Sequence, residues 1–133
     1  MKSGKYPYMT KWGLVMLTCR SSFLEKSDVE IAAICNGLGP KYFGWAVPDT
    51  IGGIRVTPSG NIHDEGYYEG GVIEDKKWDD RTFRDNMLRI VNMKPKQWGF
   101  MRKFRKWRIE VNYNAVKLAG GTAFNWKYNE KTI

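Results

Sequence analysis

Apolar residues recur three or four positions apart over the last third of the chain, which is the clearest periodic pattern in the sequence. Such spacing places apolar side chains on one face of an α-helix. A proline at position 95 and a glycine pair at 120–121 bound the pattern. It therefore predicts a long C-terminal helix that begins near residues 95–97 and ends at 120–121. Its apolar face consists of Phe104, Trp107, Val111, Ala115 and Leu118.

A second helical pattern covers about residues 79–93. Asp80 lies at its start, and at about 100° per residue it is roughly 35° from the middle of the apolar stripe. A lone carboxylate that faces a core is costly, so we expect Asp80 to have a polar partner. The apolar stripe consists of Phe83, Met87, Ile90 and Val91.

A third helical pattern contains His63, the only histidine among the 133 residues. The threonine and proline at 57–58 are typical of a helix start, and the glycine pair at 70–71 is typical of a helix end. In this helix His63 and Tyr67 share one face, one turn apart, while Asp64 points about 100° away from His63. One helix thus offers a base in one direction and a carboxylate in another.

The other segments are shorter or more polar. Ser27 and Glu30 form a capping-box pattern that opens a short helix from residue 28 to about residue 34. Glycine and proline mark a tight loop at residues 36–40, followed by a long connection at 41–56. We interpret residues 72–78 as a polar link, residues 1–11 as an irregular arm, and the apolar residues 12–19 as a helix or a strand.

Composition and charge narrow the class of protein. A chain of 133 residues predicts a single domain over residues 1–133, with an N-terminal arm of uncertain structure over residues 1–26. The net charge of +8 favours a polyanionic partner, either nucleic acid or an anionic membrane surface, although solubility alone also explains it. No apolar run reaches the ~18 residues of a membrane span, and the apolar residues 12–19 lack a signal cleavage site.

Cysteine and histidine are too few for most metal sites. Cys19 and Cys35 do not form a disulfide framework, and whether they form a bridge stays open. They also lack zinc-ligand spacing. Ca²⁺ prefers oxygen ligands, which the carbonyls of a glycine-rich turn at 36–40 and the carboxylate of Asp64 can provide. With His63 next to such an ion, the residues are those of metal-assisted ester hydrolysis.

Five motifs follow one another along residues 34–124. They read N-G-x-G-P, V-P-D-T, H-D-x-x-Y, D-R-x-F-x-x-N-M and Y-x-A-V-x-x-x-G-G-x-A-F, and they span Asn36 to Pro40, Val47 to Thr50, His63 to Tyr67, Asp80 to Met87 and Tyr113 to Phe124. The ordered set resembles the phospholipase A2 superfamily, most closely its small bacterial and phage members. H-D-x-x-Y alone is a weak signal, whereas the ordered set of five is fairly specific.

The resemblance implies an all-α fold and a Ca²⁺-dependent hydrolase of the sn-2 ester of glycerophospholipids. In such a fold, two antiparallel helices carry His63 and Asp80, next to a glycine-rich metal-binding loop and a long C-terminal helix. His63 is then the general base for water, and Asp80 orients its imidazolium. Tyr67 hydrogen-bonds to Asp80, with Tyr113 as a second candidate for that contact.

The resemblance also implies the metal ligands. Asp64 binds Ca²⁺ together with the carbonyls of Cys35, Gly37 and Gly39, and the Gly37 N–H joins the ion in stabilising the oxyanion. The chain departs from secreted members of the superfamily in two respects. Their many disulfides are absent, and the residues 41–56 lengthen the separation between the glycine loop and His63.

Aromatic and basic residues alternate at the start of the predicted C-terminal helix. This stretch has three readings: a solvated helix face, a surface that docks on anionic lipid, and a nucleic-acid contact. The phospholipase interpretation favours docking on lipid. The residues predicted to bind the membrane are Trp98, Arg102, Lys103, Arg105, Lys106 and Trp107.

Three functions from different classes remain open at this point. The leading hypothesis is the phospholipase A2-like enzyme, acting on glycerophospholipid at an anionic membrane surface. The second is a non-catalytic phage structural or membrane-contacting protein on the same scaffold, with virion or phage proteins as partners. The third is a basic nucleic-acid-binding module. The absence of a signal peptide or transmembrane pattern predicts a cytoplasmic or virion-associated protein.

Overall fold

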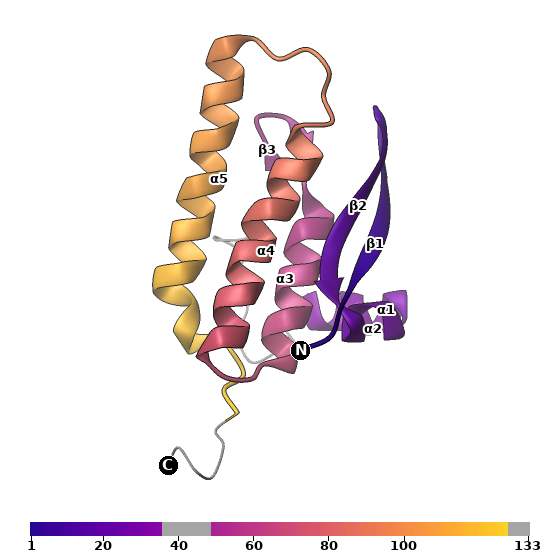
Figure 1. The fold of residues 1–133 in the computed structure, drawn as a ribbon, viewed down its shortest axis with the longest axis vertical. Helices are drawn as coiled ribbons and strands as arrows, with labels where there is room; N and C mark the ends of the chain where they lie inside the picture. Colours follow the sequence, from indigo (N-terminus) through magenta and orange to yellow (C-terminus); the bar gives the residue numbers. More distant parts are fainter. Residues whose placement is uncertain (36–48, 128–133) are drawn as a thin grey trace.

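The computed structural model describes residues 1–35 and 49–127 (Figure 1). Within these ranges the chain combines helices with two small antiparallel sheets, so the predicted all-α fold is wrong and the fold is mixed α/β. The strands are β1 (Ser3–Thr10), β2 (Gly13–Arg20), β3 (Thr50–Ile51) and β4 (Ile54–Arg55). The helices are α1 (Ser21–Glu25), α2 (Asp28–Ala33), α3 (Thr57–Glu69), α4 (Ile73–Val91) and α5 (Gly99–Ala119).

The N-terminal residues form a β-hairpin rather than an irregular arm. Strands β1 and β2 pair antiparallel, with Tyr6 opposite Leu17 and Tyr8 opposite Val15. Burial alternates along both strands, as expected when every second side chain faces the core. The sequence hides this alternation, because several side chains that face away from the core are also apolar. These exposed residues are Met9, Leu14 and Met16.

The second edge of β2 is joined to α4 by a side chain. The Oδ1 of Asn86 accepts from the Thr18 N–H at 2.9 Å, and its Nδ2 donates to the Thr18 carbonyl at 2.8 Å. This amide therefore takes the place of a neighbouring strand at that point. Asn86 is fully buried, so its hydrogen bonds are costly to lose.

Three long helices stand side by side, with α4 between α3 and α5, and strand β2 of the hairpin packs against both α3 and α4 (Figure 1). Helix α3 begins at Thr57 with Pro58 in its first turn, which confirms the predicted helix start. The predicted capping box of Ser27 and Glu30 is also present at the start of α2.

Helix α5 ends at Ala119, next to the predicted glycine pair, and begins two to four residues later than expected. The apolar face predicted for it is wrong, because Phe104, Trp107 and Leu118 are exposed. Its buried side chains are Arg105, Ile109, Asn112 and Val116.

Helix α4 is longer than predicted. It begins at Ile73, so the segment 72–78 is not a polar link. The Asp75 carboxylate accepts from the Val72 N–H at 3.0 Å and so caps the first turn. The pattern missed this start because residues 73–78 have few apolar side chains with helical spacing. The extra turns carry Lys76, which becomes part of the candidate site.

The core lies where the three helices and β2 meet. Its most buried members include Leu17, Phe83, Met87, Ile90 and Ile109, each of them 0% exposed. Burying a side chain of this size stabilises the fold by about 1.5–3 kcal/mol. The stripe predicted for α4 is thus confirmed as core. None of the helices in the described ranges combines the length and apolarity that crossing a bilayer requires.

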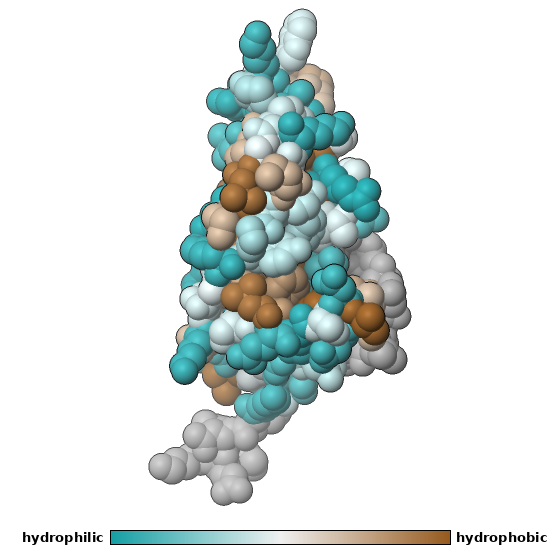
Figure 2. All heavy atoms as spheres, turned by 90° about the vertical axis from the view of Figure 1, so that its right-hand side faces the viewer, coloured by the Kyte–Doolittle hydropathy of each residue, from teal (hydrophilic) through white to brown (hydrophobic). Residues whose placement is uncertain are grey.

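Figure 2 shows the hairpin side of the molecule. Apolar residues form separate patches there, surrounded by hydrophilic ones. The exposed apolar side chains of the hairpin therefore do not merge into one continuous apolar face.

Candidate active site

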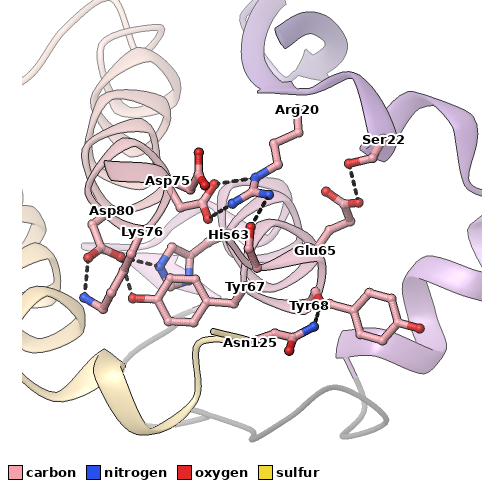
Figure 3. A network of polar contacts seen from close by, with 12 residues as sticks. Arg20, Ser22, His63, Glu65, Tyr67, Tyr68, Asp75, Lys76, Asp80 and Asn125 are labelled. Carbon is pink, nitrogen blue, oxygen red and sulfur yellow. Dashed lines mark hydrogen bonds and ion pairs between the residues drawn. The ribbon is translucent and has the colours of Figure 1, made fainter. Parts of the chain in front are cut away.

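His63, Tyr67 and Asp80 meet between α3 and α4 (Figure 3). The His63 Nε2 lies 2.9 Å from the Asp80 Oδ1, and the Tyr67 hydroxyl donates to the same oxygen at 2.6 Å. All three side chains are buried. The predicted direct contact between His63 and Asp80 is confirmed. It arises because both residues face the shared core from consecutive antiparallel helices.

The second oxygen of Asp80 binds Lys76, a residue that the sequence did not single out. The Lys76 Nζ donates to the Asp80 Oδ2 at 2.8 Å and to the carbonyls of Val116 and Lys117 at 3.2 and 3.4 Å. It is only 5% exposed. Lys76 therefore joins the carboxylate to the last turn of α5. Its spacing of four residues from Asp80 was the available signal.

Tyr113 does not take the contact with Asp80 that was considered for it. Its ring packs instead beside the Arg84 guanidinium, 4.7 Å from the ring centroid.

Gly120, by contrast, has a direct role in the site. A Cβ at this position would lie 2.3 Å from the Tyr67 hydroxyl oxygen. The first glycine of the pair 120–121, which looked like a simple helix end, therefore makes room for Tyr67.

The electrostatics of the site favour an ionised Asp80. Burial raises the pKa of its carboxyl, but the hydrogen bonds and charges of His63, with the bonds from Lys76 and Tyr67, outweigh burial and lower that pKa. Burial and the adjacent Asp80 charge raise the pKa of Tyr67, which therefore stays protonated and donates. An ionised Asp80 accepts only, so the His63 Nε2 must carry a proton.

The other ring nitrogen of His63 is then a base. Its Nδ1 is buried and has no hydrogen-bond partner among the described residues. The ring is fixed by packing against Tyr67 and Phe83, at centroid distances of 4.2 and 4.7 Å. An oxygen of Asp64 lies 4.0 Å from the Nδ1. A lone pair on a fixed ring, next to a carboxylate, suits the activation of a water molecule.

Asp64 is partly buried, with 17% of its side chain exposed, and it differs from the buried acids of α3 and α4. Asp79, Asp80 and Glu65 each form an ion pair with a lysine or arginine. Across residues 1–35 and 49–127, Asp64 has no such partner. Burial raises its pKa to about 6, and the neighbouring charge of His63 lowers it only in part. A desolvated carboxylate of this kind fits a bound cation.

The Cys35 side chain lies next to Asp64. Its thiol hydrogen-bonds to the Asp64 carboxylate, and burial with this negative charge raises the thiol pKa to about 12. Both cysteines are free, so Cys19 and Cys35 form no bridge. The predicted ligands Gly37 and Gly39 lie outside the described residues. Where the structure describes the chain, no cluster of three His, Cys, Asp or Glu side chains could hold a metal.

A second polar network lies behind the site and was missed by sequence reasoning. Arg20 binds Asp79 through two hydrogen bonds, at 3.0 and 2.6 Å, and donates to the Gly70 carbonyl at 2.8 Å. Lys26 pairs with Glu65 and with Glu69. These contacts tie the hairpin and α1 to the helices that carry His63 and Asp80. Ion pairs this far apart in sequence have no local signal.

The predicted membrane-binding residues lie in or next to the first half of α5, and all of them except Arg105 are exposed. Trp98 is 84% exposed and Trp107 is 58% exposed. Arg105 is buried, and its guanidinium donates to the Gly52 carbonyl at 2.8 Å. Arg105 therefore holds α5 against the β3–β4 turn and is not available at the surface. The basic residues exposed beside the tryptophans are Arg102, Lys103 and Lys106.

Comparison with other proteins gives no relative from which a function could be transferred. No model of a known protein family matches the chain, and neither a curated protein nor a solved structure matches it.

Proposed function

We propose that this protein is a calcium-dependent, phospholipase A2-like hydrolase that cleaves the sn-2 ester of glycerophospholipids. The observation that carries the proposal is the orientation of His63. Its Nε2 donates to Asp80. Its Nδ1 is buried beside the carboxylate of Asp64 and has no hydrogen-bond partner among the described residues. The resemblance of the five motifs to the superfamily gives the substrate class.

In this proposal, the His63 Nδ1 takes a proton from the attacking water and later gives it to the departing alkoxide. Asp80 stabilises the imidazolium that forms between these two events. Lys76 and Tyr67 hold Asp80 in place, because each donates to it from a buried position. The ring cannot rotate away, since Tyr67 and Phe83 pack on it.

Asp64 would hold the calcium ion, with the carbonyls of Cys35, Gly37 and Gly39. Such an ion would supply charge for the ester oxygen as negative charge develops there, and the Gly37 N–H would assist. The fit rests on Asp64 itself, a desolvated carboxylate that lacks a cationic side chain within the described parts of the chain.

The exposed start of α5 would bring the enzyme to its substrate. Trp98 and Trp107 are large and exposed, and Arg102, Lys103 and Lys106 lie among them. Aromatic rings insert at a membrane interface, while lysine and arginine interact with anionic head groups. We assign the anionic membrane surface as the partner of this face.

The proposal is tested with phosphatidylglycerol vesicles whose sn-1 and sn-2 chains differ. Release of the sn-2 fatty acid with calcium, and none with a chelator, is the expected result. Release of the sn-1 chain, or release that is equal with and without calcium, would contradict it. Vesicle binding without turnover would favour a non-catalytic membrane-contacting protein. Salt-sensitive binding to DNA or RNA alone would favour the nucleic-acid module.

A further inference from the structure

A groove of about 450 Å³ lies between the first turns of α4 and the last turns of α5. Its volume is in the range of small-molecule sites. The Lys76–Asp80 pair of Figure 3 forms its buried wall, on the side of Asp80 away from His63. The described residues that line it are Ile73, Lys76, Lys77, Asp80, Arg81, Tyr113, Lys117 and Leu118.

The polar side chains in the wall of this groove are already bonded to other groups of the protein. Asp80 is the one acidic side chain among its lining residues, and its two oxygens bind His63, Tyr67 and Lys76. The three protons of Lys76 are directed to Asp80 and to two carbonyls at the end of α5. Lys76 thereby also offsets the negative end of the α5 dipole.

The rim of the groove is cationic. Lys77 and Arg81 from α4 and Lys117 from α5 are exposed, and none of them has an acidic partner among the described residues. The Lys117 ammonium lies 5.7 Å from the centroid of the Tyr113 ring. Three unneutralised cations around one groove attract an anion.

The groove is also apolar, which excludes a simple phosphate or sulfate as its best ligand. Leu118 is 84% exposed and Ile73 is 44% exposed, and both line it. Exposed apolar side chains beside free cations match a ligand with an alkyl chain and an anionic head. An alkyl chain covers the apolar residues, while the head pairs with the cations at the rim.

We propose that this groove binds a single-chain amphiphilic anion, with a carboxylate head held by Lys77, Arg81 and Lys117. The site is separate from the ester-hydrolysis site, because Asp80 and Lys76 stand between the groove and His63. The inference does not depend on hydrolysis.

Calorimetric titration with octanoate, below the concentration at which it forms micelles, tests the proposal. Octanoate is expected to bind with saturation, while acetate, octanol and octyltrimethylammonium bind at least about tenfold more weakly. These probes distinguish the contribution of the anionic head to binding from that of the alkyl chain. Equal binding of octanol and octanoate would contradict a role for the cations, and equal binding of acetate would contradict a role for the chain.

A matched pair of variants locates the site. Lys77→Glu with Arg81→Glu is expected to weaken octanoate binding about tenfold, because two attractive contacts become repulsive. Lys2→Glu with Lys11→Glu makes the same charge change on exposed residues of the N-terminal hairpin segment, away from α4 and α5, and is expected to leave binding unchanged. Equal weakening in both variants would show that net charge alone binds the anion. Lys117→Glu, on the other helix, repeats the test if the first pair does not fold.

Chemical shifts upon octanoate addition give an independent readout. They are expected to change at Tyr113 and Leu118. Trp98 lies roughly 22 Å from Tyr113 and roughly 30 Å from Leu118 along α5, at about 1.5 Å per residue. Changes confined to Trp98 and Trp107 would overturn the proposal and assign the amphiphile to the aromatic face.

Discussion

Asp64 is a partly buried carboxylate without a lysine or arginine partner in the described chain, and burial raises its pKa to about 6. At neutral pH Asp64 is therefore ionised despite the free-energy cost of its desolvation, and a bound cation would offset that cost. One carboxylate and a few carbonyls predict a weak site, with a Kd of ~10⁻³ M. At about 10 mM calcium such a site stabilises the fold by about 1.4 kcal/mol, or a few degrees in Tm.

Asp64→Asn is expected to abolish this rise in Tm, because the amide cannot neutralise the ion. Asp85→Asn, at a half-exposed position on α4, is the matched control and should retain the rise. Thermal melts with and without calcium measure both. If Asp64→Asn and the native protein respond alike to calcium, Asp64 is not a ligand.

Cys19 gives a prediction for pH. Burial, with the charge of Glu65 adding to it, raises the pKa of this thiol to about 11, whereas an unfolded thiol ionises near pH 8.5. The folded state therefore keeps its proton to higher pH than the unfolded state. The stabilisation is complete below about pH 8.5 and is lost as pH rises toward 11, by up to about 3 kcal/mol.

Urea unfolding at pH 8 and pH 10.5 measures this loss. The comparison is made in a Cys35→Ser background, since burial raises the pKa of that thiol as well. Adding Cys19→Ala is expected to remove part of the alkaline decline. An identical decline with and without Cys19 would mean that other groups cause it.

The contacts of single site residues were predictable where the residues on one helix face determine which side chains meet. The contact between His63 and Asp80 follows from two helical periodicities and the cost of burying a charge. Lys76 was missed because its helix turn lay outside the apolar pattern. Arg20 was missed for a different reason: its partner Asp79 is 59 residues away, and no local pattern links two such positions.

At the scale of elements, the contact of Gly120 with Tyr67 joins the end of α5 to the candidate site. Gly120→Ala places a methyl group 2.3 Å from the Tyr67 hydroxyl oxygen. It is expected to cost about 1–3 kcal/mol of unfolding free energy and to lower hydrolysis, because Tyr67 must leave Asp80. Gly121→Ala is the matched control, since a Cβ there has no neighbour within 4 Å.

Urea unfolding and turnover of both glycine variants are the measurements. Equal stability and activity in the two variants would mean that the close approach at Gly120 is unimportant. The backbone does not confound the comparison at Gly120, because its φ of −68° is accessible to alanine.

The helices were predictable and the hairpin was not, because only the helices have clear local signals in the sequence. Helix α3 has a threonine–proline start and a glycine-pair end, and α5 has a glycine-pair end and apolar residues at helical spacing. In the hairpin, apolar side chains such as Met9, Leu14 and Met16 also occupy the outward positions. The period-two signal of a strand was therefore lost. Pairing of β1 with β2 and the bonds of Asn86 to Thr18 decide the structure of that segment instead.

At the scale of the whole molecule, the net charge of +8 favours binding to anionic membranes, and we expect the basic residues at the start of α5 to make the main contacts. Reversal of Arg102, Lys103 and Lys106 to glutamate is expected to weaken binding to anionic vesicles. Each contact contributes ~1 kcal/mol at most and less in high salt. Hydrolysis of a soluble short-chain ester should be unchanged. Vesicle sedimentation and an ester assay measure the two effects.

Reversal of three exposed lysines elsewhere, Lys2, Lys5 and Lys11, is the charge-matched control. It changes the net charge equally but leaves the aromatic face intact, so vesicle binding should fall much less. Equal loss of binding in both triple variants would mean that overall charge, rather than the start of α5, attaches the protein to lipid.

The overall architecture was predicted only in part. Three long helices and a single core follow from the periodicity of the sequence, while the mixed α/β class depends on long-range pairing that periodicity does not report. Within the candidate site, the contacts of His63 and Tyr67 with Asp80 were predicted from the helix faces, while the roles of these residues stay predictions.

The most direct test of the central claim, that His63 is the base of a calcium-dependent lipase, compares native protein with His63→Gln at saturating calcium. Glutamine preserves polarity and can donate to Asp80, but it cannot accept a proton from water. Release of the sn-2 fatty acid is expected to fall by at least about 10²-fold, the lower end for general-base catalysis, while Tm changes little. Equal turnover in the two proteins, or no turnover in folded native protein with calcium and anionic vesicles, would contradict the account.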